Sequence, residues 1–336
     1  MKNWFARLFG SRQQDVRAAP APARPRLPDT LPAPELPPAA PDAKAEVDAV
    51  FFRWLAGAAG GDAPPATERL ILDELARLAE SPERAASLVP RVPAVIPELL
   101  RSLRDESISN ADLSRMVAQD LVLVAEVVRE ANSSFYRPPS PVKNIEGAVM
   151  LLGQNGLRML IARVAFRPVI GSQSGHFAKL VAPQIWMQSE KCALACATLA
   201  PHAGVNPFEA YLAGLIQNVG LIVAFRLIDQ VYNEDVLPRS DAFAAELLGQ
   251  SRRLAHAIAR EWAFPDNVAQ ALLDAAAPGA GLAGVLASAD ALSKLRLLVD
   301  AGAVAPDDGA DGAALVAAVV TPRLRPCFDS LRAEEA

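Results

Sequence analysis

Helical periodicity dominates the hydrophobic pattern of this chain. Apolar residues recur every three to four positions, and no strand-like alternation of apolar and polar residues persists over residues 88–160. The longest periodic stretches cover residues 176–200, 206–228, 243–264 and 281–301. The pattern therefore predicts an all-α fold.

Shorter periodic stretches precede these long ones. A helix is predicted from near Ala45, and its apolar positions are Val47, Val50, Phe51 and Leu55. A second amphipathic helix is predicted to use Leu70, Leu72, Leu75 and Leu78 as most of its apolar side. Together they form accessory helices over residues 45–87, ahead of a main domain over residues 88–300. In that domain Ser109 and Asn144 are predicted N-caps, and residues 153–156 (GQNG) are predicted to be a helix end and turn.

The two ends of the chain have a different character. Residues 13–44 are rich in proline and alanine, which predicts a disordered, semi-extended linker. Residues 1–12 combine basic residues with an apolar face that contains Trp4, Phe5, Leu8 and Phe9. Such a segment suits a peripheral membrane contact or a partner's groove. The alternative is a frayed terminus, or one that docks on its own domain. Residues 301–336 are expected to form a C-terminal helix and a frayed tail.

Composition and charge exclude several classes of protein. Of the 336 residues 51% are hydrophobic and 21% charged, so a sizeable core can be buried. The net charge of −5 lacks the excess of basic residues that is typical of nucleic-acid binding, so no nucleic-acid partner is expected. No uninterrupted apolar run has the length of a membrane span, and the N-terminus lacks the apolar core of a secretory signal. A cytoplasmic protein is predicted.

Cysteine and histidine are sparse. Three cysteines do not make a disulfide framework. Cys192 and Cys196 share a helical face, and two small core residues are the simpler interpretation than a metal or redox pair. His176, His202 and His256 have no ligand-type partner at helical spacing, so surface or helix-end positions are expected.

The most informative stretch is Tyr211–Gly220, YLAGLIQNVG. It is accompanied, in order, by residues 116–136 (MVAQDLVLVAEVVREANSSFY), 145–153 (IEGAVMLLG), 186–189 (WMQS) and 262–265 (WAFP). This series resembles the HDOD family, bacterial signalling proteins named for an HD-related output domain. The resemblance covers Leu88 to Leu297. It implies a two-lobed helical domain whose second lobe is a distorted relative of the HD phosphohydrolases.

The resemblance also implies where such enzymes place their metal ligands. The corresponding residues here are Gln188, the pair Gln217 and Asn218, Arg252, and a position near Ala275. None supplies an imidazole or a carboxylate. Arg252 adds a permanent cation. The sequence therefore predicts no metal, no cofactor and no catalytic residue.

Two interpretations of these degenerate positions remain open. Gln188, Gln217, Asn218 and Arg252 either satisfy each other's hydrogen bonds and preserve inherited packing, or form a pocket for a nucleotide or another phosphate-bearing ligand. In the second case Arg252, Gln188 and Gln217 are the candidate binding residues. A second basic candidate, Arg158 with Arg163 and Arg167, is expected to be a set of solvated charges.

The favoured function is a non-enzymatic bacterial signal-transduction or regulatory protein that acts through protein–protein interaction. A sensor for a phosphate-bearing ligand is the alternative, and a residual phosphohydrolase comes third. Residues 1–12 would let a cytoplasmic protein touch a membrane or a second partner.

Overall fold

The computed structural model describes residues 41–57, 60–81, 109–118, 121–133, 140–171, 173–232, 236–275, 279–305 and 310–332, with the single positions 88, 96, 97, 100 and 138. These residues belong to one compact unit. The predicted all-α fold is confirmed: within them the only strands are two residues long. The terminal segment 1–12, with Trp4, Phe5, Leu8 and Phe9, lies outside the described residues, and so does the linker up to residue 40.

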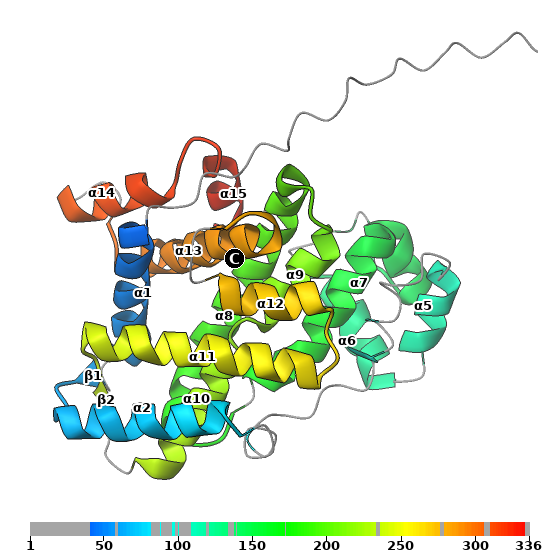
Figure 1. Ribbon diagram of the computed structural model, residues 1–336. Helices are drawn as coiled ribbons and strands as arrows, with labels where there is room; N and C mark the ends of the chain where they lie inside the picture. The colour runs from blue at the N-terminus through cyan, green and yellow to red at the C-terminus, as the bar shows by residue number, and fades with distance from the viewer. Residues whose placement is uncertain are drawn as a thin grey trace, which may run out of the picture. The chain divides into compact units, whose positions relative to one another are not determined.

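The second half of the chain forms a helical lobe around α8, which packs against α9, α10 and α13 (Figure 1). Its elements are α8 (His176–Leu199), the short 3-10 turn η3 (Ala200–Ala203), α9 (Pro207–Ile216), α10 (Val219–Val231), α11 (Asp241–Glu261), α12 (Asp266–Asp274) and α13 (Gly281–Asp300).

The predicted continuous helix over residues 206–228 is instead two helices. The side chain of Asn206 caps α9 by accepting from the amides of Phe208 and Glu209. The helix breaks at Gln217 and Asn218, and α10 begins afterwards. The span Pro207–Val231 is apolar enough to cross a membrane, but 89% of its most apolar window is buried. It therefore has the character of a core element.

Two glycines explain how closely these helices pack. A side-chain carbon at Gly214 would lie 2.7 Å from the Cα of Ala193 on α8. One at Gly220 would lie 2.0 Å from the carbonyl oxygen of Ser251 on α11. Both distances are below any ordinary contact, so only glycine allows these approaches. The stretch Tyr211–Gly220 is thus a structural core.

The first half forms a smaller group of helices, α5 (Asn110–Val117), α6 (Leu121–Ala131) and α7 (Ile145–Gly171). Both predicted caps are present: Ser109 and Asp112 bond reciprocally at the start of α5, and Asn144 accepts from the amide of Gly147. Helix α7 is kinked at Gly153, whose φ of 67° needs glycine. The predicted break at residues 153–156 is therefore present as a kink.

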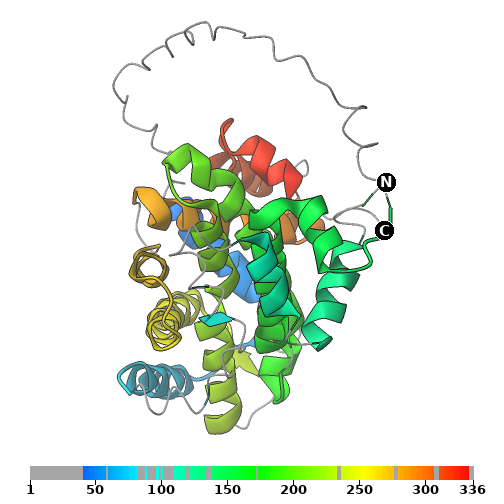
Figure 2. The same cartoon turned by 90° about the vertical axis from the view of Figure 1, so that its right-hand side faces the viewer.

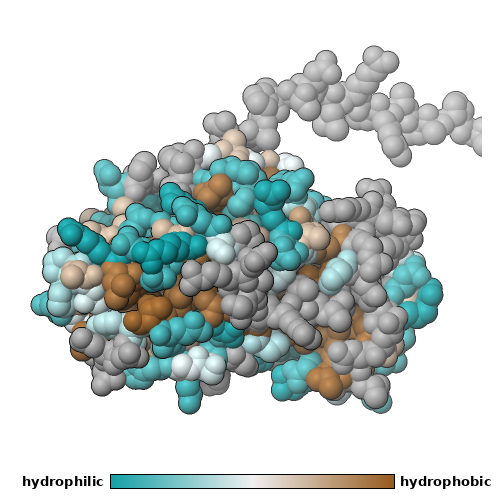
Figure 3. Space-filling view, turned by 60° about the horizontal axis from the view of Figure 1, so that its bottom comes forward, coloured by the Kyte–Doolittle hydropathy of each residue, from teal (hydrophilic) through white to brown (hydrophobic). Residues whose placement is uncertain are grey.

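The accessory helices are α1 (Pro41–Ala56) and α2 (Pro65–Ala79). Between them β1 (Gly60–Gly61) pairs in parallel with β2 (Leu237–Pro238). Both views show α2 beside α11 (Figure 1; Figure 2). The predicted apolar side of α2 is correct at Leu75 and Leu78 and wrong at Leu70, and it omitted Ile71. Ile71, Leu75 and Leu78 are buried, since they share one face at helical spacing, whereas Leu70 is 49% exposed. Figure 3, in which the bottom of the view in Figure 1 comes forward, shows hydrophobic side chains on that face of the molecule.

Helix α1 is an integral part of the second lobe. It begins at Pro41, four residues before the predicted start, and packs against α13 and α11. Its Val47, Phe51, Phe52 and Leu55 are each at most 3% exposed. Burying four such side chains contributes about 6–12 kcal/mol, as an upper bound. Helix α1 is therefore not readily detached.

The C-terminal residues are more ordered than the predicted helix and frayed tail. Two helices, α14 (Ala310–Val319) and α15 (Arg325–Ser330), follow α13. Cys327 and Phe328 of α15 are buried, and the guanidinium of Arg296 lies 4.8 Å from the centre of the Phe328 ring. A cation over an aromatic face is attractive, so this contact helps to hold the C-terminal segment against α13.

Candidate functional site

The five degenerate positions meet in one place. Gln217 and Asn218 lie at the α9–α10 break, Arg252 lies on α11, and Ala275 ends α12. These four line a single cavity of about 20 Å³. Gln188, on α8, is hydrogen-bonded to both members of the amide pair. The resemblance thus placed all five positions around a common pocket.

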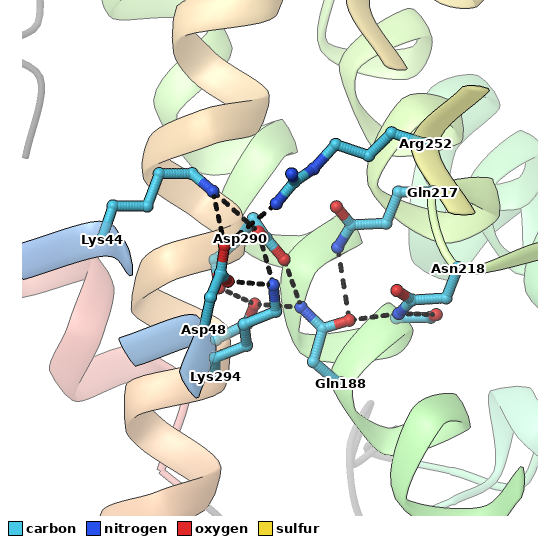
Figure 4. A network of polar contacts seen from close by, with 10 residues as sticks. Lys44, Asp48, Gln188, Gln217, Asn218, Arg252, Asp290 and Lys294 are labelled. Atoms are coloured by element: carbon cyan, nitrogen blue, oxygen red, sulfur yellow. Dashed lines mark hydrogen bonds and ion pairs between the residues drawn. The ribbon is translucent and has the colours of Figure 1, made fainter. Parts of the chain in front are cut away.

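Neutral amides form one half of this polar cluster (Figure 4). The side-chain oxygen of Gln188 accepts from Nδ2 of Asn218 and, at 3.3 Å, from Nε2 of Gln217. Asn218 also donates to Oγ of Ser189 at 3.0 Å. Gln188 and Ser189 are fully buried. The three amides are therefore linked by hydrogen bonds, whereas Arg252, which the first interpretation placed in the same group, donates to Asp48 instead.

Asp290 of α13 joins this amide half to a charged half. Its Oδ1 accepts from Nε2 of Gln188 at 2.9 Å, and its Oδ2 accepts from the ammonium of Lys294 at 2.8 Å. Nε2 of Gln188 also lies 2.9 Å from Oγ of Ser293. Asp290 therefore places a carboxylate next to the degenerate positions, bound by an amide and an ammonium.

Asp48 of α1 is the centre of the charged half. Its Oδ1 accepts from Lys294 at 2.5 Å, and its Oδ2 accepts from Arg252 at 2.9 Å and from Lys44 at 3.2 Å. The Lys44 ammonium also lies 3.6 Å from Oδ2 of Asp290. The ring of Phe51 lies 5.5 Å from the Lys294 ammonium. Three cations thus surround two carboxylates.

Burial and ion pairing shift the pKa values of the charged side chains in opposite directions. Burial by itself would raise the pKa of Asp48, but the three cations around it hold that pKa well below its usual range. Burial would lower the pKa of Lys294, yet Asp290 and Asp48 leave it raised. For Lys44 burial prevails, and its pKa is lowered despite the same two carboxylates. Lys294 is therefore the firmly charged lysine, and Lys44 is the one that loses its proton more easily.

These residues do not fit a divalent metal. Within the described part of the chain, no three His, Cys, Asp or Glu side chains gather in a group that could hold one. The two carboxylates at the pocket, Asp48 and Asp290, already bind ammonium and guanidinium groups. A divalent cation here would replace those contacts and face Lys294 and Arg252 at close range.

Sequence reasoning missed Lys44, Asp48, Asp290 and Lys294. A signal for each pair was present. Lys44 and Asp48 are four residues apart on the same helical face as Phe51 and Leu55, which are apolar. Asp290 and Lys294 have the same spacing inside a helix that is otherwise mostly Ala and Leu. Charged pairs on an apolar face indicate burial with a partner.

The cysteines and histidines largely follow expectation. Cys192 and Cys196 are buried free thiols, and burial raises the pKa of Cys192, which makes it unreactive. His176 begins α8 and His202 lies in η3, and both are exposed. His256 is half-buried, with Nδ1 2.9 Å from the carbonyl oxygen of Ala269, so it is not the simple surface residue that was expected.

The basic set on α7 corrects one expectation. Arg163 is not a solvated charge: its side chain is 23% exposed, and it pairs with Glu130 of α6 and Glu190 of α8. It therefore links the smaller helix group to α8. Arg158 is half-buried and Arg167 is exposed.

Comparison with known domains agrees with this scaffold. The HDOD domain profile matches residues 89–278. The chain belongs to the HDOD family. Of the charged half, only Arg252 lies inside the matched range; Lys44, Asp48, Asp290 and Lys294 lie outside it.

Solved HDOD-like structures share the fold. An HDOD domain protein of unknown function from Geobacter sulfurreducens is 19% identical, with a TM-score of 0.52 over 80% of this chain and 97% of that one. A Shewanella amazonensis protein provisionally named a metal-dependent phosphohydrolase is 16% identical, with a TM-score of 0.53 over 79% and 98%. A Marinobacter aquaeolei protein provisionally named a signal transduction protein is 21% identical, with a TM-score of 0.53 over 79% and 63%.

Curated relatives add little about function. The chain is 24% identical to an uncharacterised protein of Treponema pallidum over 40% of its own length, and 28% identical to the uncharacterised YuxH of Bacillus subtilis over 45%. It spans 26% and 36% of the lengths of these two relatives.

Proposed function

We propose that this HDOD protein is a non-enzymatic regulatory protein of a bacterial signalling pathway, which acts in the cytoplasm by binding a protein partner. Its helical second lobe serves as a rigid support for the contact surface. The provisional name of the Marinobacter aquaeolei relative, a signal transduction protein, is consistent with this role.

The observation that carries the proposal is the filled pocket. Where related enzymes would hold a metal, this chain has a bonded network of three amides and five charged side chains. The space left is about 20 Å³, room for about one water molecule. A network of this kind links the helices and leaves little space for a substrate.

The small volume of the cavity also argues against the alternative function, a sensor for a phosphate-bearing ligand. A phosphate group needs several times the volume of one water molecule. A phosphate group would share Arg252 with the Asp48 carboxylate, which already accepts from Nη2 and would repel a multiply charged anion.

The first test concerns catalysis. Full-length protein is purified without chelators, its metal content is measured, and hydrolysis of bis(p-nitrophenyl) phosphate is followed with added Mn²⁺. The proposal predicts substoichiometric metal and no turnover above the buffer rate. Stoichiometric Mn, Fe or Zn together with turnover would contradict the proposal and support a phosphohydrolase function.

The second test concerns the partner. Full-length protein and a chain lacking residues 1–40 are used for affinity capture from native cells. The truncation stops at residue 40 because Lys44 belongs to the charged half of the cluster. A shared partner places the contact on residues 41–336. A partner lost with residues 1–40 assigns the contact to the terminal segment, and the absence of any specific partner from both chains contradicts the proposal.

A further inference from the structure

The charged half of the cluster is not electrically balanced. Lys44, Arg252 and Lys294 carry three positive charges, and Asp48 and Asp290 carry two negative charges. None of these side chains is more than 21% exposed. An uncompensated buried charge is costly. Two events can remove the excess: the release of a proton from a lysine, or the uptake of one anion.

The cavity lies where an anion would be held. Two of the three cations, Arg252 and Lys294, line it, with the amides of Gln217 and Asn218 beside them. Of these amide groups, Nε2 of Gln217 makes only a long bond of 3.3 Å. A guanidinium has five N–H donors, and among the described contacts Arg252 gives one nitrogen, Nη2, to Asp48. Donors therefore remain for a further acceptor.

The size of the cavity selects the ligand. About 20 Å³ accommodates about one water-sized particle, which favours a small monoatomic anion over phosphate and other polyatomic oxyanions. Cations are disfavoured because Arg252 and Lys294 face the same space. Asp290 also lines the cavity, but its two oxygens are engaged by Gln188 and Lys294.

We propose that this cavity is a binding site for a single monoatomic anion of the size of chloride, which neutralises the excess charge between Arg252 and Lys294. The site goes beyond the proposed partner binding and does not depend on it. Its role is to complete the ion network that fixes α1, α11 and α13 to one another.

Bromide provides the direct test, because it scatters anomalously and is close to chloride in size. Crystals of the full-length protein are grown or soaked in sodium bromide. The proposal predicts an anomalous peak in the cavity, within contact distance of Arg252 and Gln217. A cavity without a bromide peak at high bromide concentration overturns the proposal.

Solution measurements use three matched variants. The thermal midpoint is followed while sodium chloride replaces sodium gluconate at constant ionic strength. Wild type should gain stability that saturates with chloride. Arg252→Gln removes a cavity-lining cation, and Lys44→Met removes the excess charge without touching the cavity lining; both should lose the saturating gain. The exposed neighbour Arg253→Gln should keep it. Equal responses in wild type, Arg252→Gln and Lys44→Met would refute the site.

Discussion

The two halves of the polar cluster differ in chemistry and in their position relative to the range that the HDOD profile matches. The amide half, Gln188 with Gln217 and Asn218, is neutral and lies within the range that the HDOD profile matches. The charged half is centred on Asp48 and Lys294, which lie on α1 and α13, outside that range. Neutral amides occupy three of the degenerate positions inside the matched range. Four of the five charged side chains come from α1 and α13, which lie outside it.

This difference has energetic consequences. A bonded amide contributes about 0.5–1.5 kcal/mol. Breaking a buried ion pair by removing one partner costs about 3–5 kcal/mol, because the other charge stays buried. We therefore expect the charged half to be much more sensitive to substitution than the amide half.

The largest effect is expected at Asp290, where the halves meet. Asp290→Ala removes the acceptor of both Gln188 and Lys294, and should lower the free energy of unfolding by about 3–5 kcal/mol. Asp274→Ala, at the exposed end of α12, is the matched control and should stay within about 0.5 kcal/mol of wild type. Urea denaturation measures both. Similar losses in the two variants would contradict the joining role of Asp290.

The next comparison uses two lysines that share the same carboxylates. Lys294→Met should cost about 3 kcal/mol, since it leaves Asp48 and Asp290 short of their closest cation. Lys44→Met should cost less than about 1 kcal/mol, because it removes the cation in excess and leaves Asp48 paired with Lys294 and Arg252, and Asp290 with Lys294. Burial also disfavours the charge of Lys44 and lowers its pKa. Urea denaturation at pH 7 decides between them. The reverse order would show that the charge assignments are wrong.

The contribution of Asp48 should depend on pH. Its folded-state pKa lies below the ordinary value of about 3.9, so its stabilising effect is present above about pH 4 and is lost as the pH falls towards the folded pKa. Asp48→Asn should be less stable than wild type at pH 7, and the gap should narrow below about pH 4. Denaturation curves from pH 7 to pH 3 measure the gap. A constant gap would mean that Asp48 acts by packing alone.

The smallest effect is expected in the amide half. Gln217→Ala removes a 3.3 Å hydrogen bond from a side chain that is only partly buried, and should cost about 0.5–1 kcal/mol. Thermal unfolding measures the change. A loss of stability as large as that of Lys294→Met would show that the amide half is as sensitive to substitution as the charged half.

Much of the fold and part of the site followed from the sequence. Helical periodicity located α8, α11 and α13, and the family resemblance found the five positions around the cavity. The helix break at Gln217 and Asn218 was missed because both flanking helices are buried. Their apolar pattern is therefore continuous across the break, and no sequence signal indicates where α9 ends. Pairing between Asp48 and Lys294 joins residues 246 positions apart, and local spacing carries no signal for a contact of that range.

The central proposal is that the cavity at Gln217, Asn218 and Arg252 is part of a packed core and binds no metal. Isothermal titration of Mn²⁺ into full-length wild type, and into Asp290→Asn as its partner variant, tests this most directly. The account predicts no saturable binding heat in either protein. One equivalent of Mn²⁺ bound by wild type, and lost in Asp290→Asn, would contradict it and make Asp290 a metal ligand.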